Sequence, residues 1–302
     1  MDHADRSRVT RSAHVAAQAK INLFLDVLAR EPSGYHGIVT AFLRIDLADD
    51  VTVSESSGRS LDVTGPALPT GGLGPTEKNL AYRAAAAYSD VAGWPSGFSI
   101  ALVKRIPAGG GLGGGSADAG AVLRALEAMS PKPLGPRLLD IVATLGADVP
   151  FMTLDEPMAL GSGRGDQLKP IPALEPRPLV LAVPPFAIST ADAYAWLDAD
   201  RAALGGVLGH TVAESLATWD DVSAAAHNDF ELVVSRRYPA IATILDRFRA
   251  AKSRIAMLSG SGSTVFGVFD DLPDLGGVGI GDSVRTIATW TSDRVERVTI
   301  DQ

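Results

Sequence analysis

Six of the seven residues from Gly109 to Gly115 are glycine, and this run constrains the chain more than any other feature. Glycine backbone can turn its N–H groups inward around an anion without interference from a Cβ atom. The run follows an alternating apolar segment at 98–103, typical of a half-buried strand, and precedes a helical pattern that starts near Ala117. Free amides at a helix start attract phosphate. We therefore predict a phosphate-binding loop and disfavour a flexible linker, because linkers rarely join a regular strand directly to a regular helix.

Two familiar phosphate motifs fit this loop poorly. A Walker A loop would require lysine after its last glycine, but Gly115 is followed by Ser116. The Rossmann fingerprint matches by letter from Gly109 to Gly114, but that fold needs a second parallel strand ending in an acidic residue. Here the helix leads through a proline-rich connector into another helix over 136–145. The pattern therefore disfavours a dinucleotide-dependent oxidoreductase.

The remaining segments predict a mixed α+β fold of two parts. Period-two and period-3.6 apolar patterns predict further elements on both sides of the glycine run. We expect strands at 20–27, 39–47, 50–54, 179–183, 254–258 and 264–269, and helices at 79–91, 191–197, 228–234 and 240–251. A proline-bounded linker at 170–178 suggests a boundary between an N-terminal domain over 15–169 and a C-terminal domain over 170–302. We expect residues 1–14 to form a disordered tail.

Composition narrows the possible functions. The net charge of −8 argues against a nucleic-acid or membrane partner, and the absence of cysteine excludes disulfides, thiolate nucleophiles and cysteine–zinc sites. No two histidines lie at a metal-ligand spacing such as i, i+4. No apolar run approaches the roughly 20 residues that span a bilayer, and the N-terminus lacks the apolar region of a secretory signal. We expect a cytoplasmic protein.

Four further motifs occur in order around the glycine run. They are Ala19-Lys20-Ile21-Asn22, Gly34-Tyr35-His36, Gly146-Ala147-Asp148-Val149-Pro150 and Leu258-Ser259-Gly260-Ser261-Gly262. Together the motifs resemble the GHMP kinase superfamily, named for its galacto-, homoserine, mevalonate and phosphomevalonate kinases. Within it, they resemble the branch that phosphorylates a cytidine diphosphate derivative of methylerythritol in non-mevalonate isoprenoid synthesis. The resemblance extends from about Val15 to about Phe269, and the tail beyond is unassigned.

The resemblance implies a two-lobed GHMP-kinase-like fold with the active site in the cleft between the lobes. It implies ATP and Mg²⁺ as cofactors, and an acceptor that carries a cytidine diphosphate group and reacts at the 2-hydroxyl of its methylerythritol part. One departure is Ser33, which stands where the family usually has aspartate before Gly34. We expect this change to alter a turn and not the chemistry.

The resemblance also assigns the catalytic pair. Asp148 would take the proton from the acceptor hydroxyl, and Lys20 would stabilise the reacting oxygen and keep that carboxylate ionised. Considered without the other motifs, Asp148 would be read as a helix-end aspartate and Lys20 as a solvated edge lysine.

The acceptor site would be built around aromatic side chains. Tyr35 and Tyr194 would hold the cytosine between them while His36 reads its polar edge, with Phe186 as the alternative ring. Packing on a helix face is the rival explanation for Tyr194. The predicted acceptor-binding residues are Asn22, Tyr35, His36, Thr190, Tyr194, Ser259 and Gly260.

The nucleotide site would be the glycine-rich loop together with a residue before the first predicted helix. Ser116 is also the candidate contact for Mg²⁺, which would otherwise be held through ATP. The predicted ATP-binding residues are Asn79, Pro107, Ala108, Gly109, Gly110, Gly111, Leu112, Gly113, Gly114, Gly115, Ser116 and Ala117.

Two other functions remain as alternatives. Another GHMP kinase, acting on mevalonate, homoserine or a sugar, would not need the Gly34-Tyr35-His36 motif. A non-catalytic nucleotide-binding protein of the same fold would not need both Lys20 and Asp148.

Overall fold

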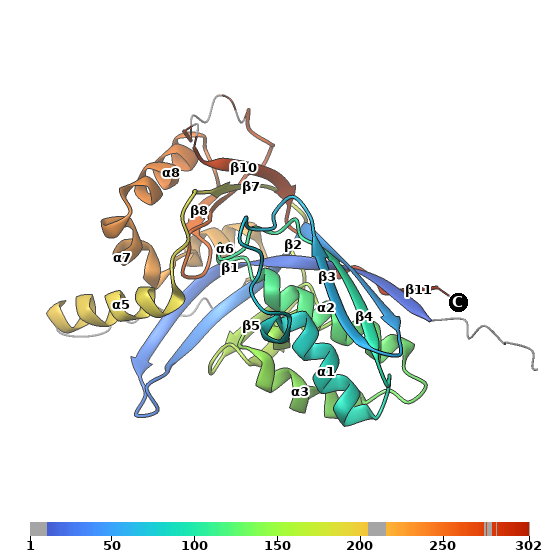
Figure 1. Ribbon diagram of the computed structural model, residues 1–302. Helices are drawn as coiled ribbons and strands as arrows, with labels where there is room; N and C mark the ends of the chain where they lie inside the picture. Colours follow the sequence, from blue (N-terminus) through green and yellow to red (C-terminus); the bar gives the residue numbers. More distant parts are fainter. Residues whose placement is uncertain (1–10, 205–215, 275, 277–279, 282, 302) are drawn as a thin grey trace, which may run out of the picture.

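The computed structural model describes residues 11–204, 216–274, 276, 280–281 and 283–301. The described chain forms two β-sheets, each accompanied by helices (Figure 1). This arrangement confirms the α+β, two-lobed prediction. Among the described residues, no helix is long and apolar enough to cross a membrane.

The first sheet has seven strands, in the order β11-β1-β2-β4-β3, with β5 paired to β2 and β6 paired to β5. The antiparallel ribbon of β1 and β2 extends beyond the other strands of the sheet (Figure 1). There β1 contacts α7 of the second lobe. The strands are β1 (Ser12–Arg30), β2 (His36–Glu55), β3 (Arg59–Thr64), β4 (Phe98–Val103), β5 (Met158–Ser162), β6 (Gln167–Pro170) and β11 (Thr299–Asp301).

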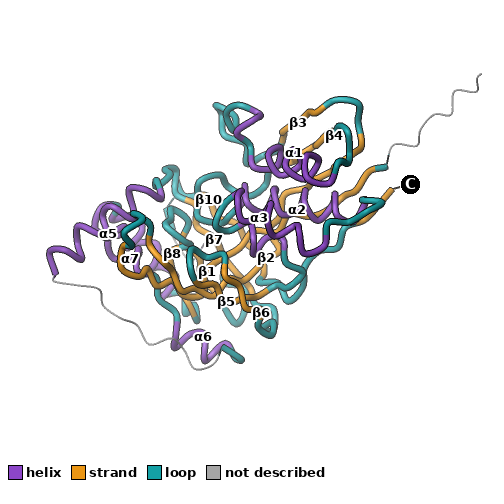
Figure 2. Tube along the Cα trace, turned by 90° about the horizontal axis from the view of Figure 1, so that it is seen from below, coloured by secondary structure: helices purple, strands orange, loops and turns teal. Residues whose placement is uncertain are grey.

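Helices cover one face of this sheet. The helices α1, α2 and α3 lie together in Figure 2, and α2 contacts both β1 and β2. Alanine-rich faces allow this close packing, and the buried side of α2 includes Val122, Leu123 and Leu126. The elements are α1 (Leu80–Ala92), α2 (Gly114–Met129), α3 (Leu138–Leu145), α4 (Val149–Thr153) and the short 3-10 turns Thr76–Lys78 and Gly135–Arg137.

The second sheet has four antiparallel strands in the order β10-β7-β9-β8. A separate apolar core joins it to α5, α7 and α8 through residues such as Val180, Phe230 and Phe248. The elements are β7 (Pro178–Val183), α5 (Thr190–Leu204), α6 (Trp219–Ala225), α7 (Asp229–Arg237), α8 (Pro239–Ala250), β8 (Ile255–Leu258), β9 (Val265–Val268) and β10 (Arg285–Trp290).

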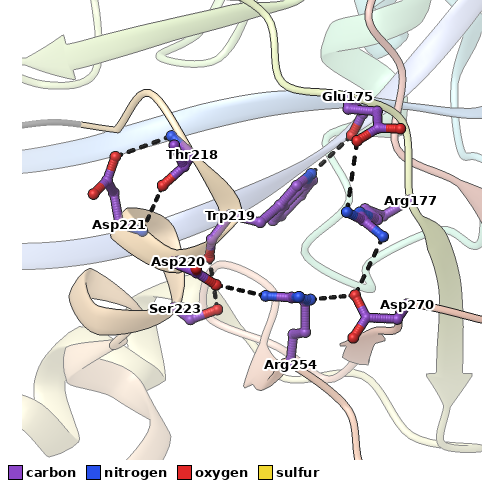
Figure 3. A network of polar contacts seen from close by, with 9 residues as sticks. All are labelled: Glu175, Arg177, Thr218, Trp219, Asp220, Asp221, Ser223, Arg254 and Asp270. Atoms are coloured by element: carbon purple, nitrogen blue, oxygen red, sulfur yellow. Dashed lines mark hydrogen bonds and ion pairs between the residues drawn. The ribbon is translucent and has the colours of Figure 1, made fainter.

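The segment between β6 and β7, which includes Glu175 and Arg177, is held by a network of polar contacts (Figure 3). Trp219 Nε1 donates to the carbonyl of Glu175 at 2.8 Å, and Arg177 contacts Asp270 at 3.2 Å. Arg254 pairs with the same aspartate and also contacts Asp220 of α6. These contacts fix the predicted linker against the second lobe.

Most predicted elements are present, but several boundaries differ. The strands expected at 39–47 and 50–54 are one strand, β2, and residues 12–14 of the predicted tail belong to β1. The prediction missed β3, β5, β6, β10, β11, α4 and α6. Most of these elements are short, and all of the missed strands except β6 pair with strands distant in the chain, so local patterns signal them weakly.

The helix after the glycine run begins earlier than expected. Its first helical residue is Gly114, not a residue near Ala117, and Gly113 precedes it in a left-handed conformation with φ of 70°. The last glycines therefore form the first helical turn, and they present its free amides to the adjoining hollow.

Candidate active site

The glycine run lines a hollow of about 560 Å³ at the start of α2. Gly109, Gly111 and Gly113 all have positive φ values, a conformation that residues with a Cβ rarely adopt. The other predicted loop residues from Pro107 to Ser116 also line this hollow, as do Lys78, Leu80, Lys104 and Asp118. The loop is thus shaped to receive an anionic ligand.

The turn between β8 and β9 holds this loop in place. Ser259 Oγ donates to the carbonyl of Gly111 at 3.0 Å, and the backbone N–H of Thr264 donates to the carbonyl of Gly110 at 3.2 Å. A Cβ on Gly111 would lie only 2.0 Å from the Ser259 carbonyl oxygen. The close approach of two loops from different lobes therefore requires glycine here.

Lys20 and Asp148 face each other beside the loop, with Nζ 3.6 Å from Oδ2. Lys20 is buried, and its ammonium donates to Asn22 Oδ1 at 2.7 Å. Asn22 in turn donates to Thr40 Oγ1 at 2.8 Å, and Thr40 Oγ1 donates to a β1 carbonyl. This chain of hydrogen bonds between β1 and β2 fixes the position of the ammonium.

Asp148 is the N-cap residue of α4, but its side chain makes no capping hydrogen bond. Helix-start aspartates usually accept such a bond. The carboxylate, 30% exposed, instead faces Lys20, so the geometry does not support the helix-end explanation.

A central hollow of about 280 Å³ connects two larger ones. It is lined by Lys20, Asn22, Asp148 and Gly260, and it shares Gly111, Gly113, Ser116 and Thr190 with the glycine-loop hollow. It shares Ala147, Arg164, Thr190 and Tyr194 with a third hollow of about 940 Å³. The central hollow, with Lys20 and Asp148, therefore adjoins both the glycine-loop hollow and the third hollow.

The third hollow contains Tyr35, His36 and Tyr194, three of the residues predicted for the acceptor site. His36 and Tyr194 stack directly on each other with ring centroids 5.0 Å apart. Burial, and then the charge of Asp148, raise the pKa of Tyr194. His36 Nδ1 contacts the Leu28 carbonyl at 2.9 Å and Nε2 contacts Asp198 at 3.2 Å, so both ring nitrogens have partners.

The two remaining rings differ in exposure. Tyr35 lines the third hollow and is 58% exposed. Phe186 instead stacks on Tyr238 with centroids 4.7 Å apart and packs against the core of the second lobe. It is absent from the residues that line the hollow, whereas Tyr194 is present.

The remaining predicted site residues differ in whether their side chains face a hollow or support the structure around it. Asn79 lines the glycine-loop hollow, but its side chain caps α1 by accepting from the Ala81 N–H at 2.9 Å. Ala117 is buried beneath the loop. Ser259 tethers the loop from a buried position, while Gly260 and Ser261, from the same predicted motif, line the central hollow.

Sequence reasoning missed a buried ionic cluster behind the glycine loop. Lys104 Nζ contacts Asp49 and, at 2.6 Å, Asp118. Asp49 Oδ1 also accepts from the N–H groups of Arg105 and Ile106, which lead into the loop. Burial raises the pKa of Asp118 to about 8 and outweighs the opposing effect of Lys104. A lysine directly after a predicted strand and an aspartate inside an apolar helix were the available signals.

Two further positioning residues were missed. Arg44 is fully buried and donates to the carbonyls of Phe151, Met152 and Leu154, which holds the short helix after Asp148. Burial lowers its pKa to about 9. Asn228 donates to the carbonyls of residues 258 and 260 at 2.8 Å and so supports the turn that reaches the glycine loop.

The fold and the site define a class of protein, the GHMP kinases, which are ATP-dependent small-molecule kinases. The GHMP kinases N terminal domain matches residues 79–156, and the GHMP kinases C terminal domain matches residues 212–278. Homoserine kinase from Cytophaga hutchinsonii has the same fold, with a TM-score of 0.62 at 17% identity over 96% of this chain and 97% of that one.

More similar relatives narrow the family. A 4-diphosphocytidyl-2-C-methyl-D-erythritol kinase of Geobacter metallireducens is 38% identical over 93% of this chain and 96% of its own length. One from Deinococcus radiodurans is 39% identical over 85% and 84% of the two chains. A solved structure of 4-(cytidine 5'-diphospho)-2C-methyl-D-erythritol kinase covers 92% of this chain and 98% of its own, with a TM-score of 0.74 at 34% identity. The chain belongs to the 4-diphosphocytidyl-2-C-methyl-D-erythritol kinase family.

Proposed function

We propose that this protein transfers the γ-phosphoryl group of ATP to the 2-hydroxyl of 4-diphosphocytidyl-2-C-methyl-D-erythritol, giving the 2-phosphate and ADP. The observation that carries this proposal is the row of adjoining hollows from the glycine loop, past Lys20 and Asp148, to the hollow lined by Tyr35, His36 and Tyr194. The family relatives are named for the same acceptor. The boundary between the two lobes would lie near residue 170, between β6 and β7.

The chemistry follows from the central pair. Asp148 accepts the proton of the acceptor hydroxyl as its oxygen forms a bond to the γ-phosphorus. The bond from that phosphorus to the bridging oxygen breaks, and ADP leaves with the electron pair. Lys20 lies 3.6 Å from the carboxylate, where its positive charge stabilises negative charge on the reacting oxygen. Phosphoryl transfer depends mostly on such positioning and electrostatics.

Magnesium would enter with the nucleotide. Among the described residues, no group of three His, Cys, Asp or Glu side chains could hold a metal ion by itself. Ser116 lines both the glycine-loop hollow and the central hollow, so its hydroxyl is suited to contact a phosphate-bound Mg²⁺. The ion would neutralise charge on the phosphates when bound.

The acceptor base would lie between Tyr35 and Tyr194, both of which line the third hollow. Tyr194 carries His36 stacked on it at 5.0 Å, and Tyr35 is 58% exposed. Base–aromatic stacking contributes roughly 1–3 kcal/mol and does not distinguish cytosine from uracil. Because His36 already contacts Leu28 and Asp198, its main role would be to fix Tyr194. Discrimination would then depend on other polar groups of the hollow.

An acceptor panel tests the proposal. The purified protein would be incubated with ATP, Mg²⁺ and one alcohol at a time, with ADP release and phosphorylated product both measured. We expect rapid turnover with the cytidine substrate and much slower turnover with its uridine analogue, free methylerythritol, mevalonate and homoserine. A preference for mevalonate or homoserine would replace this acceptor with that of another GHMP kinase. Nucleotide binding without any turnover would favour a non-catalytic role.

A further inference from the structure

The third hollow, which would hold the acceptor, is called the acceptor hollow below. Four described residues line both this hollow and the central hollow, and Arg164 is the one charged side chain among them. It lies in the turn between β5 and β6, and no feature of the sequence had singled it out. Because the central hollow also contains Lys20 and Asp148, Arg164 stands where the acceptor hollow opens toward the catalytic pair.

The turn that carries Arg164 is well anchored. Gly163 and Gly165 on either side have φ values of 68° and 96°, and the Ile38 N–H donates to the Gly163 carbonyl at 2.7 Å. A Cβ on Gly165 would lie 3.6 Å from the carbonyl oxygen of Ala147, the residue before Asp148. The turn therefore packs beside the catalytic aspartate.

The guanidinium of Arg164 is held but not neutralised. It lies 4.0 Å from the ring centroid of Tyr35, and no carboxylate pairs with it among the described ion pairs. Asp166, its nearest acidic neighbour in the chain, accepts from the Arg164 backbone N–H at 3.0 Å. A guanidinium stacked on a ring keeps its N–H edge available for an anion. Arg30, in the same hollow, instead donates its Nε–H to the Gly34 carbonyl.

We propose that Arg164 binds the diphosphate of the acceptor and thereby selects diphosphate-linked acceptors, an inference that rests on the proposed function. The acceptor base would lie near Tyr35, and the reacting hydroxyl must reach Asp148. The diphosphate joins these two parts of the acceptor, so it passes the mouth of the hollow where Arg164 stands. A guanidinium offers two parallel N–H groups to phosphate oxygens, which gives orientation as well as affinity.

Binding measurements that need no turnover test this role. Calorimetry would compare cytidine, CMP and CDP with the wild-type protein and with Arg164→Gln, Arg164→Lys and Arg30→Gln. We expect wild-type protein to bind CDP about tenfold more tightly than cytidine, because hydrogen bonds to charged groups are stronger than neutral ones. Arg164→Gln should abolish that ratio, and Arg164→Lys should retain part of it as a point charge. Arg30→Gln should leave the ratio unchanged.

Kinetics supply a second readout. With Arg164→Gln, KM for the diphosphate acceptor should rise about tenfold while KM for ATP stays constant, because the glycine-loop hollow does not include this residue. An unchanged CDP-to-cytidine ratio in Arg164→Gln, or an equal loss in Arg30→Gln, would overturn the inference. A protein that shows the Arg164-dependent preference for CDP but fails to phosphorylate the acceptor would support this site and refute the proposed function.

Discussion

At the scale of single residues, the central interaction is the pair of Lys20 and Asp148. Their 3.6 Å separation, and the absence of a capping bond to Asp148, make the carboxylate available for proton transfer. This arrangement could not be derived from either residue separately, because each has an ordinary structural explanation in the sequence.

Asp148→Asn keeps the size of the side chain but removes the proposed base. We expect kcat to fall by about 10²–10⁴ with ATP affinity nearly unchanged, because general-base loss has that magnitude. Steady-state kinetics and ADP calorimetry would measure both. Asp140→Asn, at an exposed position of α3, is the matched control. Activity within a few-fold of wild type in Asp148→Asn would rule out the base.

Lys20→Met should produce a comparable loss of kcat. The double variant with Asp148→Asn should lose much less than the product of the single effects, because residues that act as a unit are not additive. A double-mutant cycle on kcat would measure this coupling. Fully multiplicative losses would show that the two groups act independently.

The pKa of Asp118 gives a pH prediction. Burial raises this pKa from 3.8 to about 8, so between these values the folded protein holds a proton that the unfolded chain has released. Stability from this group must therefore decrease as pH rises through that window, by at most about 1.4 kcal/mol per pH unit. Urea unfolding at pH 5, 6, 7 and 8 should show a steeper decline for wild type than for Asp118→Asn. Parallel curves would contradict the protonated state.

At the scale of elements, the glycine loop and the first turn of α2 act together. The positions differ in what substitution would do: a Cβ on Gly113 would lie 2.8 Å from Met152 Cε, so Gly113→Val would disturb packing as well as any ligand. Gly115 has no positive φ, and a Cβ there would meet only Leu80 at 3.6 Å. A substitution at Gly115 can therefore test ligand binding without disturbing the fold.

Gly115→Ala should therefore fold normally and bind ADP more weakly. The added methyl enters the hollow where phosphate approaches, and loss of one charge-assisted hydrogen bond corresponds to roughly tenfold in affinity. Calorimetry with ADP and thermal unfolding would be compared with Gly71→Ala, where a Cβ meets nothing within 4 Å. Unchanged ADP affinity in Gly115→Ala would show that phosphate does not use this part of the loop.

At the scale of the whole molecule, the C-terminal segment ties the second lobe back to the first. After β10 the chain returns, and β11 pairs with β1. Gln18 on β1 is buried and donates to Ser292 and to the Arg294 carbonyl, while its Oε1 accepts from the Glu296 N–H at 2.9 Å. The motif resemblance ended near Phe269, but the segment from β10 to β11 is thus part of the fold.

Gln18→Ala should lower the free energy of unfolding by about 1–3 kcal/mol, because it leaves buried donors and acceptors without partners. KM values should remain unchanged, because Gln18 lies outside the three connected hollows. Denaturant unfolding would be compared with Gln167→Ala at an exposed position of β6. Equal stability of the two variants would mean that the tail contributes little.

The sequence by itself determined the features that depend on neighbouring residues. The glycine loop could be predicted because consecutive glycines give the backbone its freedom, and β4 and the helices of eight or more residues could be predicted because apolar periodicity is local. The ordered motifs likewise indicated the superfamily and the fold, and they predicted Lys20 and Asp148 as a catalytic pair. These properties survive in the linear chain because they need no distant partner.

Only the tertiary structure decided which side chains meet. It placed Arg164 over Tyr35, stacked His36 on Tyr194, removed Phe186 from the acceptor hollow and paired β11 with β1. Contacts between residues far apart in the chain depend on how two separate cores pack and on which buried polar groups find partners. Those outcomes are set by the geometry of the assembled lobes, because short-range propensity carries no information about distant partners.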